Sequence, residues 1–283
     1  MQITERIHAL KIPFTVPVSP EIKVDRFAFV YLIFGEKIHL IDSGVAGAEA
    51  TIRNYIQQQG RLPEAVSSLL LTHAHPDHIG SAQSITARTG CTVFAHRLAR
   101  DWIENTEQQF KERPVPGFPS LVEGPVPVDN LVEGGETIAL EENIHCTVFH
   151  TPGHSNGSIS LLFEEDQSLF TGDALVSPGD LPMYDDISTC FESIDILKQI
   201  EHVEHLFSSW EPPIRGLETI RRRMDASTAY LERIHTAVLE NANREKVYDP
   251  AALCQKTVKD LGLPPSAANP LVAKAFASSL SRR

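Results

Sequence analysis

The chain has 283 residues, 42% of them hydrophobic, and carries 25 Lys and Arg against 37 Asp and Glu, a formal net charge of −12. This length can bury a large core and indicates one large domain, alone or with an appendage. The acidic balance argues against a nucleic-acid partner, because such proteins need basic stripes on their surface. The basic run Arg221-Arg222-Arg223 lies within an amphipathic helical pattern and is expected to form a solvent-exposed face.

Cysteine usage and the start of the chain indicate a reducing location. The cysteines form no CxxC pair, and each lies among apolar or small residues, as buried reduced thiols do: Cys91, Cys146, Cys190 and Cys254. The first residues show no signal-peptide pattern, and no apolar run approaches the length that spans a membrane. We therefore expect a soluble cytoplasmic protein without a membrane partner.

Residues 3 to about 175 show strand patterns separated by a few helices. Residues 26–34 and 38–41 flank the turn Gly35-Glu-Lys37 and are predicted to form a hairpin. The elements predicted to follow are a helix over residues 46–59 that stops at Gly60, a strand ending at Thr72, a helix over 79–89, a strand over 91–95 and a helix over 98–112.

Residues 113–130 differ in character, because they contain five prolines and little periodicity. A structureless stretch of this length is more often functional than idle, so a loop that covers the substrate is one prediction and a surface excursion is the other. The apolar side chains nearby could line a pocket beneath this segment or belong to the core: Trp102, for which we prefer the core, Phe110, Phe118 and Leu121.

Strands resume after this segment, and helices dominate after about residue 186. Strands are predicted over residues 137–140, 144–149, 158–163, 168–170 and 206–208, and a helix over 190–200. Apolar residues then recur at spacings of three, four and seven from Leu217 to Val238, which predicts a long amphipathic helix. Asp249 and Asn269 each precede a proline, as helix caps do.

The chain is therefore predicted to comprise a main domain over residues 1–215 and an all-helical extension over residues 216–283. The extension is expected to pack on the main domain. Its alternatives are to complete a pocket wall or to pair with a second subunit.

The most informative feature is the run Thr72-His-Ala-His-Pro-Asp-His78, which places three imidazoles and a carboxylate directly after the apolar run Ser68-Leu-Leu-Leu71. A strand ending at Thr72 would deliver them to its carboxyl end, and the turn at Pro76 would direct the last two side chains at the same volume. Neutral imidazole nitrogen and carboxylate oxygen are ligands of zinc and iron in sites for hydrolysis or oxygen chemistry. The candidate metal ligands here are His73, His75, Asp77 and His78.

Other predicted strands also end next to histidine or aspartate side chains that can bind a metal ion or orient its ligands. One strand runs into Thr151-Pro-Gly-His-Ser-Asn-Gly157, where His154 lies at a glycine-flanked turn that lets the backbone approach an ion. Another runs into Thr171-Gly-Asp-Ala174 and presents Asp173 in the same way. Asp42, at the end of an earlier strand, is predicted to orient a ligand or the motif loop. One edge of a sheet would then carry the whole site.

With these motifs the chain resembles the metallo-β-lactamase fold superfamily over roughly residues 3–212. His73-Ala-His-Pro-Asp-His78 resembles its HxHxDH motif, and the Thr-Pro-Gly-His and Thr-Gly-Asp segments resemble the settings of its next two ligands. The resemblance implies an α/β fold, a four-layer αββα sandwich with the site along one edge of its two sheets, here with a C-terminal all-helical appendage. It implies that residues 1–215 form the catalytic domain and assigns ligands as follows: His73, His75 and His154 to a first metal ion, Asp77 and His78 to a second, and Asp173 as the bridge.

One departure concerns the final histidine that the family commonly supplies in a Gly-His-Gly setting. The corresponding stretch here is Phe207-Ser-Ser-Trp-Glu-Pro-Pro213, with Trp210 in place of the histidine, and tryptophan offers only an N–H donor. Either Glu211 completes a binuclear site as an oxygen ligand, or the second ion is weakly held or absent. We expect one or two Zn²⁺ ions, with iron or manganese as alternatives because a carboxylate ligand favours harder ions.

The resemblance implies a metal-dependent hydrolase in which a metal-activated hydroxide attacks a small ester, lactone or thioester with an apolar portion. Asp77 would be the catalytic residue that orients the nucleophile and takes its proton. The Gly-Cys-Gly-Arg stretch typical of glyoxalase II-like thioesterases is absent after Asp173, and Val176 stands where acyl-homoserine lactonases carry a tyrosine. The expected partner is a small-molecule substrate, and a homodimer is a further expectation.

Three alternatives remain open. The fold is shared by persulfide dioxygenases, whose single iron would here be held by His73, His154 and Asp173. A non-catalytic metal-binding protein with a decayed site is the second alternative. The third is a serine hydrolase based on Gly153-His-Ser-Asn-Gly157, but the nucleophile elbow requires a following helix, and residues 158–163 alternate like a strand.

Overall fold

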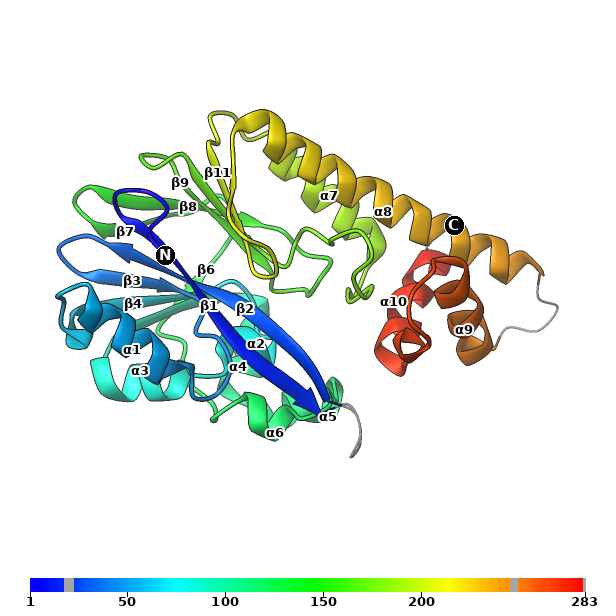
Figure 1. The fold of residues 1–283 in the computed structure, drawn as a ribbon, viewed down its shortest axis with the longest axis horizontal. Helices are drawn as coiled ribbons and strands as arrows, with labels where there is room; N and C mark the ends of the chain where they lie inside the picture. Colours follow the sequence, from blue (N-terminus) through cyan, green and yellow to red (C-terminus); the bar gives the residue numbers. More distant parts are fainter. Residues whose placement is uncertain (18–22, 245–248, 282–283) are drawn as a thin grey trace.

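The computed structural model describes residues 1–17, 23–244 and 249–281. It contains two six-stranded mixed sheets that pack face to face, with helices on their outer faces (Figure 1). The first sheet consists, in spatial order, of β1 (Ile7–Pro17), β2 (Lys23–Phe34), β3 (Ile38–Ile41), β4 (Val66–Leu71), β5 (Thr92–His96) and β6 (Asn130–Val132). The second consists of β12 (Ile214–Arg215), β11 (His205–Ser208), β10 (Ser168–Gly172), β9 (Ile159–Phe163), β8 (Ile144–His150) and β7 (Thr137–Glu141).

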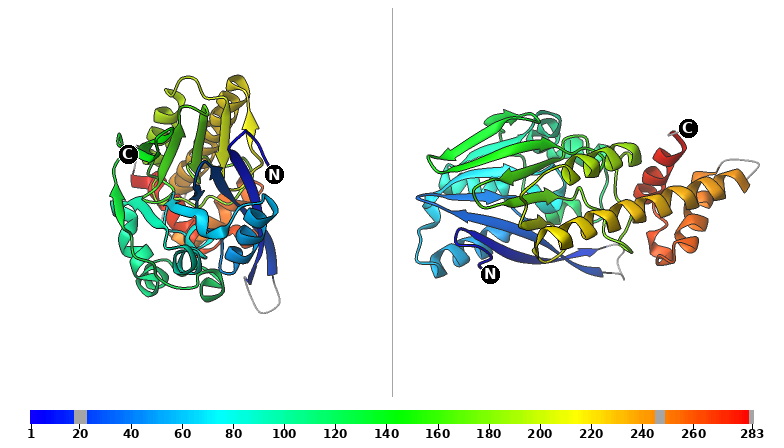
Figure 2. Two further views of the ribbon diagram at one scale, coloured as in Figure 1. Left: turned by 90° about the vertical axis from the view of Figure 1, so that its left-hand side faces the viewer. Right: turned by 90° about the horizontal axis from the view of Figure 1, so that it is seen from above.

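The helices divide between the two outer faces of the sandwich (Figures 1 and 2). Those against the first sheet are α1 (Ala48–Gln58), α2 (Pro76–Ile79), α3 (Ala82–Thr89), α4 (Arg100–Glu104), α5 (Thr106–Glu112) and α6 (Phe118–Leu121). Those beyond the second sheet are α7 (Ile187–Lys198), α8 (Leu217–Arg244), α9 (Pro250–Asp260) and α10 (Pro270–Ser281). The predicted αββα sandwich with a helical appendage is thereby confirmed.

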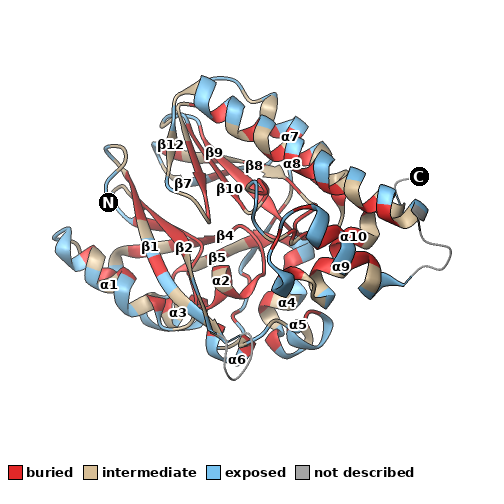
Figure 3. Cartoon of the chain, turned by 45° about the vertical axis from the view of Figure 1, so that its right-hand side comes forward, coloured by how far each residue is buried: buried red, intermediate tan, exposed pale blue. Residues whose placement is uncertain are grey.

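Three buried apolar clusters fill the spaces between these layers. One lies between the first sheet and its helices, a second between the two sheets, and a third between the second sheet and α7–α10. The strands are buried accordingly, while the outer faces of the helices are exposed (Figure 3). The four cysteines are free buried thiols, as predicted. Among the described residues, no helix combines the length and apolarity needed to cross a membrane.

Two predicted helices are each divided in two. The 98–112 helix breaks at Asn105, whose side chain accepts a hydrogen bond from Gln108 N and so begins a new helix, α5. The 79–89 helix is interrupted at Gly80, which packs so closely that an added Cβ would lie 2.5 Å from Val45 Cα. Helical periodicity predicted the helical character of both segments, but these local contacts set their boundaries.

The proline-rich segment 113–130 is not a detached covering loop. It contains the short helix α6, and its side chains Phe118 and Leu121 are buried in the cluster beneath the first sheet. Both caps predicted in the C-terminal extension are present: Asp249 accepts from Ala251 N, and Asn269 accepts from the first residues of α10.

Candidate metal centre

Backbone contacts join the strand ends of the two sheets at one edge of the sandwich. Ile159 N, at the start of β9, donates to Thr72 O after β4 over 2.9 Å. Gly172, at the end of β10, packs against the same threonine, because an added Cβ would lie 2.8 Å from its hydroxyl oxygen. The φ of +51° at Gly172 suits glycine as well. The segments that carry His73 and Asp173 are thus held against each other.

The loop that carries His154 is fixed by its neighbour Gly153. This glycine has a φ of +121°, and an added Cβ would lie 2.5 Å from Cys190 N in α7. Its carbonyl oxygen accepts hydrogen bonds from Asp185 N and Asp186 N, at 2.7 and 3.1 Å. A side chain larger than hydrogen at this position would therefore displace the loop from α7.

Three of the predicted ligands converge through their ring nitrogens. His75 Nδ1 lies 3.1 Å from His73 Nε2 and 2.7 Å from His154 Nε2, and all three side chains are buried. A neutral imidazole has one N–H and one lone-pair nitrogen, so three nitrogens that face one point are best satisfied by an ion that accepts three lone pairs. This group of histidines fits a metal ion.

A second group lies beside the first. His78 Nε2 is 3.4 Å from Asp77 Oδ2 and 3.4 Å from Asp173 Oδ1. These three atoms are buried and have no hydrogen-bond partner among the residues that the structure describes. Buried polar atoms without partners are costly, so their convergence also fits a cation. The other oxygen of Asp173, Oδ2, is 3.3 Å from His154 Nε2, so this carboxylate lies between the two groups.

The charges around the two groups differ. Burial lowers the pKa of His73 and His75 well below 6.5, which favours the neutral form that binds metals. Burial also opposes charge on His78, but the carboxylates of Asp173, Asp77 and Asp42 together raise its pKa well above 6.5. The surplus of carboxylates at the second group therefore attracts positive charge.

Asp42 supports the site as predicted, through hydrogen bonds. Its carboxylate accepts from Thr72 N and Thr72 Oγ1, each at 2.8 Å, and lies 2.7 Å from His78 Nδ1. A hydrogen bond to Nδ1 leaves Nε2 of His78 to face Asp77 and Asp173. Asp42 therefore fixes both the motif loop and the orientation of the His78 ring.

Trp210 lies at the site, but Glu211 has other partners. Trp210 Nε1 donates to Asp173 Oδ2 over 2.8 Å. The Glu211 carboxylate accepts from Arg223 Nε at 2.7 and 2.9 Å and from Ser208 Oγ at 3.1 Å. The side chain of Arg223 is only 9% exposed, so the expectation that the whole basic run 221–223 is solvent-exposed is wrong for this residue. These contacts do not favour Glu211 as a metal ligand.

Sequence reasoning missed two residues beside the site, one in α5 and one directly after it. Gln109 donates a hydrogen bond from Nε2 to Ala74 O, between His73 and His75. Arg113 follows one turn later and is 95% buried, and after burial its charge has the largest effect on the pKa of His75, which it lowers. The sequence signal was weak, because a helical Gln and Arg four residues apart are also typical of a solvated face.

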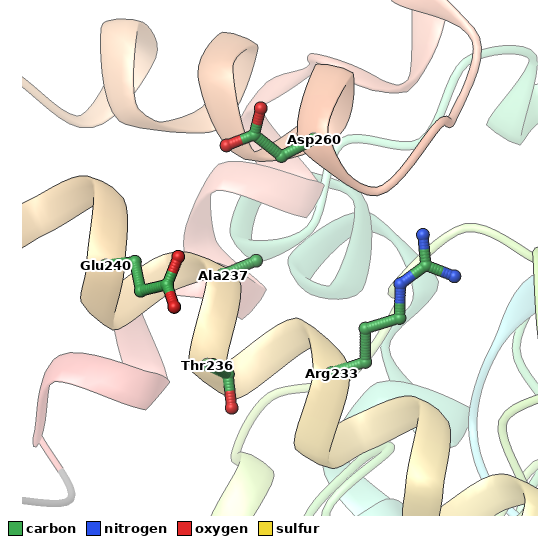
Figure 4. Close-up of a pocket in the computed structure, with 5 residues that line it drawn as sticks. All are labelled: Arg233, Thr236, Ala237, Glu240 and Asp260. Carbon is green, nitrogen blue, oxygen red and sulfur yellow. The ribbon is translucent and has the colours of Figure 1, made fainter.

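The sequence also singled out Trp102 and Ser155 as features to place relative to the metal centre. The Trp102 ring is 6.3 Å from the His75 ring and packs against the core, as preferred. Ser155 precedes β9 directly, so the helix that a nucleophile elbow requires is replaced by a strand. A surface cavity of about 550 Å³ lies between α8 and α9 (Figure 4), and none of the candidate metal ligands lines it.

The fold and these two groups define the class of protein, a four-layer sandwich with a His- and Asp-lined site for divalent metal at its sheet edge. A family model described as the metallo-beta-lactamase superfamily matches residues 24–254, and the chain belongs to that superfamily.

Several of the curated relatives are named as hydrolases. A probable metallo-hydrolase of Bacillus subtilis is 29% identical over 150 residues, which are 53% of this chain and 66% of the relative. A hydroxyacylglutathione hydrolase of Hyphomonas neptunium is 25% identical over 193 residues, 67% of this chain and 66% of the relative. The matches thus span less than two thirds of the length of these relatives.

Solved structures with the same fold cover almost the whole chain, including its helical extension. A beta-lactamase domain protein from Burkholderia ambifaria has a TM-score of 0.73 at 20% identity and covers 100% of this chain and 88% of its own. A metallo-beta-lactamase family protein from Thermus thermophilus has a TM-score of 0.72 at 19% identity, with 99% and 95% coverage.

Proposed function

We propose that this protein is a metal-dependent hydrolase of small esters, lactones or thioesters. The observation that carries the proposal is the meeting of two ligand groups at one sheet edge. In this proposal His73, His75 and His154 would hold the first ion, Asp77 and His78 would hold the second, and Asp173 would contribute to both.

A bound divalent ion supplies the nucleophile, by lowering the pKa of water from ~15.7 to about 7, and polarises the electrophilic oxygen. Asp77 has a buried oxygen, Oδ2, without a hydrogen-bond partner among the described residues. One of its oxygens can therefore face the ion while the other orients the attacking water and accepts its proton. Asp42 keeps His78 in place while this charge develops.

Thioesters are the substrate class that the relatives support best. The names of curated relatives include hydroxyacylglutathione hydrolase from three bacteria, at 25 to 32% identity. A thiolate is also a better leaving group than an alkoxide or an amine. We therefore rank thioesters first, then lactones and esters.

The test is to load the chelator-stripped protein with Zn²⁺, Mn²⁺ or Fe²⁺ and assay each form on a panel of small thioesters, lactones and esters. Turnover with Zn²⁺ or Mn²⁺ that is lost on chelation and in His75→Ala is the expected result. Absence of turnover on every member with every metal would defeat the proposal.

The iron-loaded form also tests the alternative chemistry. His154 Nε2 and His73 Nε2 lie 3.3 and 3.9 Å from Asp173 Oδ2, so these residues could hold a single iron. Oxygen uptake with glutathione persulfide, without hydrolysis, would favour a persulfide dioxygenase. Zinc as the resident ion, a cytoplasmic location and a homodimer stay predictions.

A further inference from the structure

A buried arginine whose guanidinium donates no hydrogen bond to any residue that the structure describes lies beside the metal centre. Arg113 directly follows α5, and its side chain is 6% exposed. Its Nε is buried without a partner among the described residues, and its nearest carboxylate oxygen, Asp185 Oδ1, is 4.0 Å from Nη1. Burial lowers the pKa of Arg113 and the carboxylates of Asp185, Asp77 and Asp173 raise it, but none of these carboxylates accepts a hydrogen bond from the guanidinium.

The position of α5 places this charge at the site. One turn before Arg113, Gln109 binds the carbonyl of Ala74 in the metal-binding loop. Arg113 N donates to Gln109 O over 2.8 Å, so Arg113 closes the last turn of α5 next to Gln109. Its charge acts on both His75 and His154, from the two loops that supply the first ligand group.

The C-terminal extension adds a second cation. Lys274 in α10 places Nζ 3.1 Å from Asp185 Oδ1, the same oxygen that Arg113 approaches. The backbone of Asp185 donates to Gly153 O, beside His154, so this carboxylate is tied to the ligand loop. Arg113 and Lys274 thus approach one carboxylate oxygen, with the Arg113 side chain buried and the Lys274 side chain 61% exposed.

We propose that Arg113 and Lys274 form a binding subsite for a carboxylate on the substrate, at the end distant from the bond that is cleaved. The two oxygens of a carboxylate match the fork of the Arg113 guanidinium, which donates no hydrogen bond to any residue that the structure describes. Asp185 holds the two cations in place until the substrate arrives. The subsite gives α10 a role in substrate recognition.

The inference rests on the proposed hydrolase function and narrows its substrate class. The substrate would be an acyl thioester or ester that carries a free carboxylate, separated from the reacting carbonyl by a short apolar spacer. A neutral analogue of the same length would lose this contact and leave the arginine buried and unpaired.

Equilibrium binding tests the subsite without requiring turnover. Glutarate and its monomethyl ester differ only in one terminal carboxylate, and both retain a carboxylate that can face the metal. Calorimetry on the zinc-loaded full chain is expected to show that glutarate binds roughly ten-fold tighter, since hydrogen bonds between charged groups are the strong ones. The difference should shrink in Arg113→Gln, shrink by a smaller factor in Lys274→Gln, and grow in Asp185→Asn.

Arg215→Gln is the matched control, because Arg215 also pairs with a carboxylate, that of Glu204, but is 77% exposed and lies at the opposite end of β11 from Trp210. Equal binding of the two ligands by the wild type, or an undiminished difference in Arg113→Gln, overturns the subsite. If Arg113→Gln does not fold, an undiminished difference in the exposed-site variant Lys274→Gln overturns it. A binding difference without turnover of any ester defeats the hydrolase and retains the subsite, and turnover without a binding difference does the reverse.

Discussion

The side chain of Asp42 holds two other residues of the site in place through hydrogen bonds. Asp42 has a positive φ of 61°, which is uncommon for a residue with a side chain and fits its position at the sharp end of β3. From there its carboxylate reaches both Thr72 and His78. The cost of this backbone conformation is offset by the three hydrogen bonds that it makes.

Asp42→Asn is predicted to lower the affinity for the second metal ion by about 10- to 100-fold, because an amide cannot accept from Thr72 and His78 as the carboxylate does. Titration against a chelator of known affinity, with the fold checked by circular dichroism, measures the change. Asp25→Asn, an exposed aspartate of β2, is the control. A folded Asp42→Asn protein with unchanged affinity would contradict this role.

Trp210 places an N–H donor at the position where the family commonly has a metal-binding histidine. Its hydrogen bond occupies Asp173 Oδ2, the oxygen closest to the first ligand group. Tryptophan also supplies no lone pair to a metal ion, so we expect the wild type to bind one ion tightly and a second weakly.

Trp210→His should raise the affinity for the second ion by roughly ten-fold, since an imidazole offers a lone pair to that ion. Elemental analysis after dialysis reports ions per chain, and Trp210→Phe removes the donor without adding a ligand. If the histidine and phenylalanine variants bind the same number of ions as the wild type, the assignment of this position is wrong.

At the scale of elements, a few side chains connect the two sheets. Glu141 in β7 accepts from Glu36 N and Lys37 N at 2.9 and 2.7 Å and lies 3.0 Å from His39 Nε2 in β3. It therefore holds the β2–β3 turn against the second sheet. Burial opposes charge on Glu141, but these hydrogen bonds lower its pKa below 4.5.

This contact predicts loss of stability in acid. A carboxyl group whose pKa is lowered by folding stabilises the protein above its unfolded pKa, and this contribution is lost as the pH falls below about 4.5 through the folded pKa. Burial lowers the pKa of His39 below 6.5, so its contribution decreases in the same direction, starting near pH 6.5.

Glu141→Gln should cost about 1 to 3 kcal/mol at pH 7 and flatten the decline below pH 4.5. Urea unfolding at several pH values measures both effects, with the neighbouring Glu142→Gln as control. An unchanged acid decline would exclude Glu141 as its source.

At the scale of the whole molecule, the helical extension shares a core with the sandwich. One apolar cluster runs from Leu162 and Leu169 in the second sheet to Phe276 in α10. We propose that residues 1–215 and 216–283 are units of sequence that fold together. Removal of the second would expose the apolar side chains of this cluster that α8–α10 cover.

Phe276→Ala is predicted to lower the free energy of unfolding of the whole chain by about 3 to 5 kcal/mol, because Phe276 is 1% exposed. Tryptophan fluorescence, which reports on the sandwich, and circular dichroism should shift together in denaturant. Ile196→Ala, at a side chain 40% exposed, should change stability by under about 1 kcal/mol. A fluorescence transition that does not move would show that the extension unfolds independently.

The sequence by itself determined the positions of most strands and the motifs whose family resemblance implies the αββα class and the side chains that meet at the sheet edge. Strand ends were readable because apolar runs stop shortly before His73, His154 and Asp173, and ligands that lie within one loop are close together in any fold. Three further strands, β1, β6 and β12, and the breaks at Gly80 and Asn105 were not foreseen. Those breaks depend on packing and a side-chain cap, which periodicity does not record.

Only the tertiary structure decided which partners the remaining charged and polar side chains take. From the sequence, Trp210 could have been a core residue remote from the site and Glu211 a metal ligand. In the structure Trp210 donates a hydrogen bond to Asp173, and Glu211 accepts one from Arg223. Arg113 and Lys274 are 161 positions apart and meet at Asp185 because α5 and α10 approach the same loop. Such pairings join segments distant in the chain, and the local pattern of apolar and polar residues contains no record of them.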